Sequence, residues 1–142
     1  MSLSLSTLRQ GISTKISEIS GFKLSKHSPE FFARTENTVA HLAYTVGLNS
    51  STATEERQRR SVGVYIQTPV TVIFSYRLRP LDIYPTDYDL AMDKEEQVIQ
   101  KVLESYVSDN QFTIRYVSST REVTDSQEYI IITIEFTTLH TI

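Results

Sequence analysis

Four aspartates lie close together in the second half of the chain, and clustered carboxylates are ligands that calcium ions prefer. These residues are Asp82, Asp87, Asp89 and Asp93. An EF-hand loop starting at Asp87 would place Met92 at its sixth position and Val98 at its twelfth, where a glycine and a glutamate are needed. The pattern is instead typical of acidic residues at a helix N-terminus, where the helix dipole favours negative charge. We therefore predict no metal site here.

The other side chains with catalytic potential have no spacing that indicates a known site. The histidines share no metal-ligand spacing, and neither an HExxH nor an HxH motif is present. A Ser-His-Asp triad is defined by its arrangement in space, so the sequence does not exclude one. The GxSxG motif that often contains the serine is absent. The glycines are too scattered for a phosphate-binding loop. The three histidines are His27, His41 and His140, and the four glycines are Gly11, Gly21, Gly47 and Gly63. We expect no catalytic residue and no cofactor, and hence a protein that is not an enzyme.

Arginine gathers in one part of the chain. Five of the fourteen cationic residues are Arg57, Arg59, Arg60, Arg77 and Arg79. The first three follow Glu55 and Glu56 in the polar segment Asn49–Arg60, which supports two interpretations. In one, the segment is a solvated loop whose glutamates offset the arginines. In the other, it is a docking tip that becomes ordered against a partner, since a guanidinium group makes several hydrogen bonds to one surface.

Length and composition exclude several classes of function. The chain has 142 residues, enough for one domain with a core that needs no disulfide or metal. Its net charge of −3 and pI near 5.6 give no basic patch of the kind that nucleic-acid binding needs. The lack of cysteine excludes a disulfide framework and a thiolate site, and it fits a reducing compartment. We see neither a signal peptide nor a run of about 18 apolar residues, so we expect an intracellular protein without a membrane partner.

The most regular pattern runs from Ser61 to Arg79, where apolar and polar residues alternate. Side chains of a strand point alternately to opposite faces, so this pattern predicts one dry face and one wet face. The dry face consists of Val62, Val64, Ile66, Thr68, Val70, Val72, Phe74, Tyr76 and Leu78. At about 3.3 Å per residue the strand would reach ~60 Å, whereas a domain of this size has a radius of gyration of about 14 Å. We therefore expect the strand to bend, to break at Pro69, or to project as a ribbon that assembles with other chains.

Two large apolar residues, Tyr65 and Ile73, interrupt the wet face of this strand. A single exposed apolar side chain needs no explanation. Two on one ribbon with unpaired edges are compatible with a subunit contact, because an open strand edge is a template for pairing. The predicted interface therefore combines these two residues with the tip residues Glu55, Glu56, Arg57, Arg59 and Arg60.

The remaining patterns predict an α+β fold in a single domain of residues 1–142, with a long β-hairpin whose loop projects at about residues 49–60. Apolar residues at steps of three and four indicate amphipathic helices, and alternating residues indicate strands. Each helix needs one apolar face covered, so we expect an antiparallel or mixed sheet with both helices on one side. The expected order is α-β-β-α-β-β. The first half has a helix at 4–19, an extended linker with a short strand or turn of helix at 21–37, and strands Ala40–Leu48 and Ser61–Arg79. The second half has a helix Asp87–Val107 capped by Thr86 or Asp87, a strand at 112–116, a hairpin loop at 118–128 and a strand Tyr129–Leu139.

With these elements in place, the chain resembles the tail terminator proteins of tailed bacteriophages. The resemblance covers about Leu5 to Phe136 and rests on size, element order and the amphipathic first helix. Two stretches carry most of it: Thr71-Val-Ile-Phe-Ser-Tyr-Arg-Leu-Arg-Pro at the end of the long strand, and Asp87-Tyr-Asp-Leu-Ala at the start of the second helix. The segments 21–37 and Asn49–Arg60 have no clear counterpart in it.

The resemblance implies a structural virion protein of the tail or neck, assembled in the host cytoplasm. Such subunits form a homo-oligomeric ring, commonly a hexamer, that caps the tail tube, stops its polymerisation and joins it to the neck. The implied partners are copies of the chain itself, the tail tube protein and a neck or head-completion protein. Ser75, Arg77 and Arg79 would line the lumen, through which DNA passes only transiently. No membrane partner is implied.

Two other functions stay open from the sequence. One is a different head–tail connector or neck subunit with a similar fold and different neighbours. The other is a small ligand-binding or enzymatic α+β domain, which would need a deep pocket with convergent polar groups.

Overall fold

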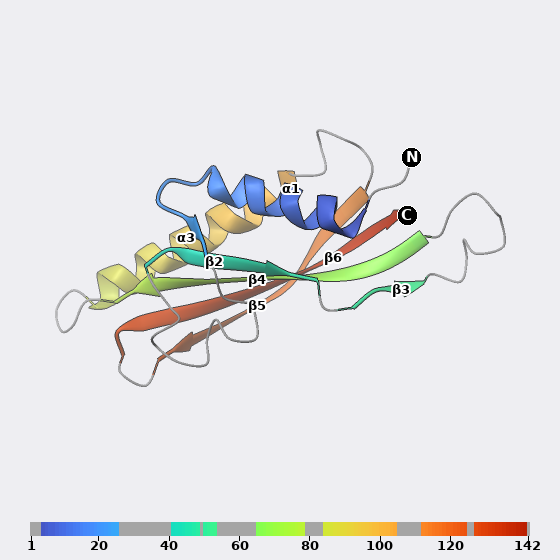
Figure 1. The fold of residues 1–142 in the computed structure, drawn as a ribbon. Helices are drawn as coiled ribbons and strands as arrows, with labels where there is room; N and C mark the ends of the chain where they lie inside the picture. The colour runs from blue at the N-terminus through green and yellow to red at the C-terminus, as the bar shows by residue number, and fades with distance from the viewer. Residues whose placement is uncertain are drawn as a thin grey trace.

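Six strands form one mixed sheet in the part of the chain that the computed structural model describes, and two helices lie on one of its faces (Figure 1). The described residues are 4–25, 41–48, 50–53, 65–78, 84–104, 112–124 and 127–141. Their elements are α1 (Leu5–Ser17), β1 (Lys23–Leu24), β2 (Ala43–Gly47), β3 (Thr52–Ala53), β4 (Tyr65–Arg77), α3 (Tyr84–Glu104), β5 (Phe112–Val123) and β6 (Tyr129–Thr141). The strand order is β1-β2-β4-β6-β5, with β3 also paired to β4. This arrangement confirms the predicted α+β fold with its helices on one face.

The centre of the sheet is the antiparallel pair β4 and β6. The two strands have 13 residues each, and their pairing runs without interruption from Tyr65 opposite Thr141 to Arg77 opposite Tyr129. At about 3.3 Å per residue this ladder is ~43 Å long. The even-numbered residues of both strands face the helices, as the alternation predicts. Completely buried among them are Val70, Val72, Phe74, Ile130, Ile132, Ile134 and Phe136.

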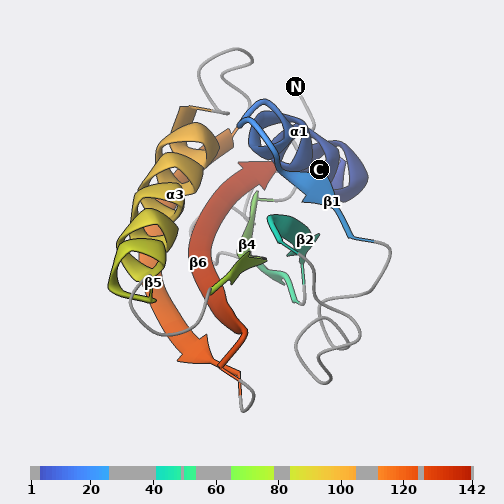
Figure 2. The same cartoon turned by 90° about the vertical axis from the view of Figure 1, so that its left-hand side faces the viewer.

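The two helices cover this apolar face (Figure 2). They contribute Leu8, Ile12 and Ile16 from α1, and Ala91, Val98 and Val102 from α3. The first helix starts at a capping serine, Ser4, whose hydroxyl accepts a hydrogen bond from the Thr7 amide at 3.1 Å. The buried Tyr44 hydroxyl of β2 donates to the Ser13 carbonyl at 2.9 Å, which fixes α1 on the sheet.

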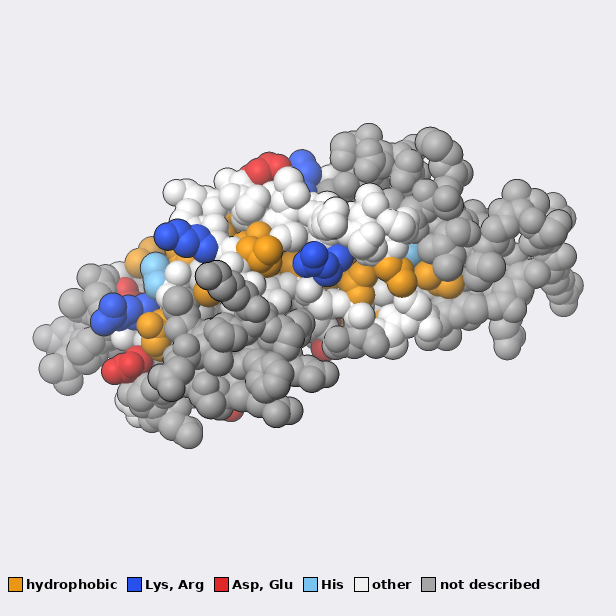
Figure 3. All heavy atoms as spheres, viewed as in Figure 1, with side chains coloured by type: hydrophobic (Ala, Val, Ile, Leu, Met, Phe, Trp, Pro, Cys, Tyr) orange, Lys and Arg blue, Asp and Glu red, His pale blue; other side chains and the backbone are white. Residues whose placement is uncertain are grey.

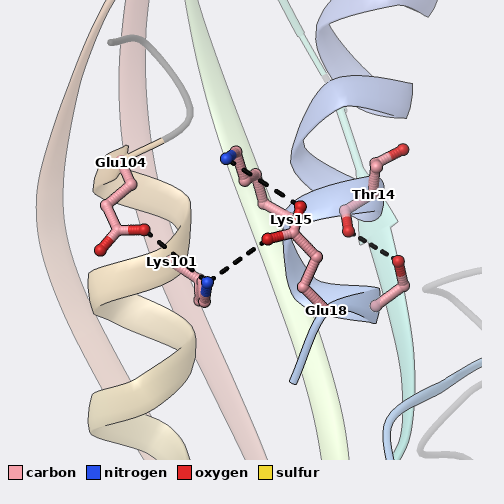
Figure 4. A network of polar contacts seen from close by, with 6 residues as sticks. Thr14, Lys15, Glu18, Lys101 and Glu104 are labelled. Carbon is pink, nitrogen blue, oxygen red and sulfur yellow. Dashed lines mark hydrogen bonds and ion pairs between the residues drawn. The ribbon is translucent and has the colours of Figure 1, made fainter. Parts of the chain in front are cut away.

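A chain of exposed ion pairs joins the ends of the two helices (Figure 4). Lys101 of α3 contacts Glu18, just after α1, at 3.3 Å, and it also lies 3.9 Å from Glu104. Lys15 lies 4.0 Å from Glu18. Pairs of this kind in water contribute less than about 1 kcal/mol each. The apolar contacts beneath them therefore hold the helices in place.

The third predicted strand is longer than expected. We predicted a strand at 112–116 followed by a loop at 118–128, but β5 continues to Val123. A β-bulge between Tyr116 and Ser118 leaves Val117 without a partner on β6. One extra residue reverses which side chains face the core, so the alternation that predicts a strand is interrupted at Val117. The polar residues after it were therefore predicted to form a loop.

Two further boundaries differ from the prediction. The helix predicted from Asp87 begins at Tyr84, so neither Thr86 nor Asp87 is its cap; Pro85 fits the first turn because its missing N–H has no partner there anyway. Part of the predicted loop Asn49–Arg60 is strand, since β3 pairs with β4. Residues 26–37 of the predicted linker and 105–107 of the predicted helix lie outside the described residues.

None of the described helices is long and apolar enough to span a membrane.

A tight corner forms where β1, β2 and the end of β4 meet. Leu42 has a positive φ of 59°, its amide donates to the Ser75 carbonyl at 2.8 Å, and its carbonyl accepts from Lys23 at 3.0 Å. This positive φ lies just before β2, which begins at Ala43 and not at the predicted Ala40. Gly21 lies against the same leucine with a φ of 89°, and a Cβ there would come within 2.8 Å of Leu42 Cδ1. Only glycine meets both conditions without strain.

His41 completes this corner as a hydrogen-bond acceptor. Its Nδ1 accepts the Arg77 backbone N–H at 3.1 Å, and its ring packs edge-on against Tyr76 with centroids 4.6 Å apart. Burial lowers the pKa of His41, and the positive charges of Arg77 and Lys94 add to this effect while Asp87 opposes it. The imidazole must be neutral to accept this hydrogen bond, because both nitrogens of the charged ring are donors.

We expect the His41 contact to weaken in mild acid. Its pKa is lower in the folded than in the unfolded chain, so the unfolded state binds more protons and the stabilising contribution is lost as pH falls below about 6.5. His41→Asn offers an acceptor oxygen and does not titrate. Urea denaturation between pH 7.5 and 5 should show a smaller loss of unfolding free energy for His41→Asn than for the wild type. Equal losses would show that His41 carries no pH dependence.

The centre of the ladder should tolerate truncation poorly. Phe74 is completely buried on β4 and packs against Phe22, with ring centroids 5.3 Å apart. Phe74→Ala should lower the free energy of unfolding by about 3–5 kcal/mol, because it removes apolar burial and leaves a cavity. The exposed Gln67 on the opposite face of β4 provides the control, and Gln67→Ala should change stability by less than about 0.5 kcal/mol. A similar small effect at both positions, measured by chemical denaturation, would contradict this view of the core.

Candidate assembly surface

The predicted docking tip lies outside the described residues. This applies to Glu55, Glu56, Arg57, Arg59 and Arg60, and also to the predicted lumen residue Arg79. The two anchors of the tip are described: Ala53 ends β3, and Tyr65 begins β4. Ala53 is paired with Ile66, the neighbour of Tyr65, so the two anchors lie close together in the sheet. Its role as a docking element stays a prediction.

From Tyr65 to Arg77, the described part of the long strand is paired within the sheet and is not a ribbon with two unpaired edges. β6 pairs with β4 along one side, and β2 and β3 pair with parts of the other side. The ~43 Å length is accommodated because β6 is equally long. This corrects the expectation that the edge of the Ser61–Arg79 strand is available to neighbouring copies. Residues 61–64 and 79 of that strand are not among those described.

Several residues predicted on the wet face of this strand are buried in the subunit. Ile73 is 8% exposed and packs with Ala43 and Ile131 on the face opposite the helices. Ser75 is completely buried, so it does not face an open lumen in the isolated chain. The face of β4 that was predicted to contact solvent is therefore buried at Ile73 and Ser75. The alternation of residue types alone did not indicate this. Arg77 is exposed, and the backbone of Tyr65 pairs with Thr141.

Among the described strands, β5 forms the long edge of the sheet that has no further strand beside it. This strand has 12 residues, it ends the strand order, and it pairs with β6 alone among the described strands. Tyr116 and Val117 lie on it with 39% and 50% of their surfaces exposed. An edge strand presents backbone N–H and C=O groups to which another strand can pair. The sequence signal for this edge is weak, because the bulge at Val117 interrupts the alternation.

Other exposed apolar side chains are more scattered. Leu139 on β6 is 37% exposed and Leu90 on α3 is 40% exposed, while Leu5 and Leu24 lie on α1 and β1. Figure 3 shows the hydrophobic side chains of the face seen there in short groups separated by basic side chains. Scattered apolar residues are normal on a protein surface. Tyr116 and Val117 differ from them because they are consecutive residues on an open strand.

A charged pair fixes the edge strand to α3. Arg121 of β5 donates from Nε and Nη2 to the two carboxylate oxygens of Glu95, both at 2.6 Å. The Glu95 side chain is 5% exposed, whereas that of Arg121 is 40% exposed. The hydrogen bonds to Glu95 raise the pKa of Arg121. Two parallel bonds define the orientation of the guanidinium plane, so β5 cannot slide along α3 without breaking them.

The described part of the surface offers an edge to which another strand can pair. Within it, no group of three or more histidine or acidic residues lies close enough to hold a metal ion. Asp87 is buried at the start of α3 and belongs to the helix N-terminus. His41 and His140 lie near opposite ends of the β4–β6 ladder, because His140 is opposite Ile66 and His41 bonds to Arg77. The open β5 edge is therefore our candidate functional site.

Comparisons with known proteins give no functional assignment. No family model matches the chain, and no curated protein matches it. Two similar solved structures come from Akkermansia muciniphila. One, a structure without its transmembrane region, has a TM-score of 0.39 and 6% identity, covering 100% of this chain and 88% of that one. The other, a crystal structure, has a TM-score of 0.38 and 7% identity, covering 97% and 74%. Similarity this low carries no argument about function.

Loss of either partner of the Arg121–Glu95 pair should destabilise the protein, but by different amounts. Arg121→Leu leaves the Glu95 carboxylate buried without its partner, whereas Glu95→Gln leaves an arginine that water can reach. We expect Arg121→Leu to destabilise by about 3 kcal/mol and Glu95→Gln by about 1–2 kcal/mol. Combining the two substitutions should recover part of the loss. Denaturation of all four proteins forms a double-mutant cycle, and strictly additive effects would contradict a direct coupling.

Proposed function

We propose that this protein is a structural subunit that assembles with copies of itself into a ring, as tail terminator proteins of tailed bacteriophages do. The observation that supports this most is the open 12-residue edge of β5, with Tyr116 and Val117 exposed on it. An edge of this length can pair with another chain through its backbone. The β-bulge and the exposed charged residues Arg115, Arg121 and Glu122 limit which chains can pair there, so we expect a specific partner strand.

The subunit also has two different edges, which a ring requires. A closed ring uses a heterologous contact, in which one patch of each subunit meets a different patch of the next. The β5 edge lies at one end of the strand order, and the short β1 lies at the other. Contact between two β5 edges would instead be isologous and would close as a dimer. Ring assembly therefore requires the β5 edge of one copy to meet another surface of its neighbour.

In this proposal the ring caps the tail tube, stops its growth and presents its other face to the neck. The tip residues Glu55, Glu56, Arg57, Arg59 and Arg60 dock onto the tube or the neck protein. Arg77, exposed at the end of β4, faces the lumen. A net charge of −3 suits a channel that lets DNA pass without holding it.

A charge placed at the open edge should block assembly without unfolding the subunit. Val117 is half exposed and unpaired, so Val117→Lys should change stability by less than about 0.5 kcal/mol. Gln10→Lys adds the same charge at an exposed position of α1 and serves as the matched control. Sedimentation velocity over a concentration series, with and without purified tail tube, should show rings for the wild type and Gln10→Lys but monomers for Val117→Lys.

Three outcomes would contradict this proposal. A wild-type chain that stays monomeric at high concentration and with tail tube present would exclude a ring-forming terminator. A Val117→Lys variant that forms the same rings as the wild type would exclude the β5 edge as the contact. A discrete dimer would indicate isologous pairing and a function other than a ring.

A further inference from the structure

A buried histidine without hydrogen-bond partners lies near the end of β6. His140 is 1% exposed, and neither Nδ1 nor Nε2 has a hydrogen-bond partner. Within the described part of the chain these are the only buried side-chain nitrogen or oxygen atoms in that state. A neutral imidazole has one N–H donor and one acceptor nitrogen, and buried groups of this kind are normally paired. Packing alone does not explain why an imidazole with two unpaired nitrogens is buried at this position.

His140 lies in a row of residues that crosses four strands. Phe112 of β5 is opposite His140, His140 is opposite Ile66 of β4, and Ile66 is opposite Ala53 of β3. Figure 1 shows the end of β6 beside the first part of β4, with β3 at the same end of the sheet. His140 is next to Thr141, the last described residue of β6, and Phe112 is the first described residue of β5. The row therefore lies at the described end of this ladder.

The polar groups next to this row on the same face are already paired and uncharged. The Thr138 hydroxyl donates to the Thr68 carbonyl at 2.9 Å, and the Thr68 hydroxyl lies 2.9 Å from that of Ser51. On β5 the next residue of this face is Ile114. Burial lowers the pKa of His140, and no charged side chain of the described residues contributes to the shift. Among the described side chains of β4, β5 and β6, no carboxylate lies on this face beside the ring to balance a positive charge.

We propose that the end of β6 is an acid-sensitive latch, closed while His140 is neutral and released when His140 takes up a proton. A protonated imidazole in this site is a buried charge without a counter-charge, and it reaches water only if the strand end separates from β4 and β5. The closed state excludes the proton and the open state accepts it with an ordinary pKa of about 6.5. The population of the open state therefore increases as the pH falls below that value.

The latch has a consequence for docking that rests on the proposed function. The predicted docking residues from Glu55 to Arg60 lie between Ala53 and Tyr65 in the sequence. Ala53 is in the row that contains His140, and Tyr65, opposite Thr141, is next to that row. Release of the β6 end removes the partner strand from the start of β4. Mild acid would then loosen the pairing at Ala53 and Tyr65 while the centre of the ladder stays paired.

Amide hydrogen exchange of the dilute protein tests the latch without any need for assembly. After correction for intrinsic exchange rates, the amides near the His140 row should open up to about tenfold more at pH 5.5 than at pH 7.5, since one pH unit below 6.5 corresponds to one decade of proton binding. The Ile130–Ile134 amides should keep their protection. His140→Leu should abolish the difference, whereas His41→Asn keeps His140 and should retain it.

Three results would overturn the latch. They are equal protection at the two pH values in the wild type, a uniform loss of protection across β6, and a retained local effect in His140→Leu. The wild-type imidazole signals give a test that needs no variant: a His140 that titrates near pH 6.5 with unchanged amide protection also overturns it. These measurements use monomer, so a failure of ring assembly leaves the latch standing, and a failed latch leaves the ring proposal standing.

Discussion

The antiparallel pairing of β4 with β6 is the interaction on which the rest of the structure depends. Thirteen consecutive residue pairs hold these strands together, and their even-numbered side chains form the floor on which both helices pack. A register shift of one residue would turn this apolar set to the opposite face. The length of the pair also decides the outline of the subunit, because a ~43 Å ladder is long for a domain of this size.

This central pair determines which surfaces are available to partners. With β4 enclosed by β6, β2 and β3, the open edge lies on β5, and the contact of Arg121 with Glu95 fixes that edge strand against α3. Assembly through β5 would leave the core untouched. The far end of the ladder contains the buried His140, and it is there that we propose the acid-sensitive latch.

Patterns with a strict period were predictable from the sequence. The alternation from Ile66 to Leu78 and from Ile130 to Phe136 identified the two central strands and their buried face, and the three-and-four spacing identified α1. The bulge at Val117 was not predictable, because one extra residue shifts the alternation and makes an edge strand read as a loop. The burial of Ile73 and Ser75 and the isolation of His140 depend on which strands become neighbours, and a single strand pattern carries no such information.

The central claim is that copies of this chain meet along β5. Cryo-electron microscopy of the assembled protein, alone or on tail tube, tests it most directly because it locates residues 112–123 relative to the neighbouring subunit. The account predicts a closed ring with a central channel in which the β5 edge contacts a different surface of the next copy. A ring whose β5 edges all face solvent, or particles that contain only single subunits, would contradict it.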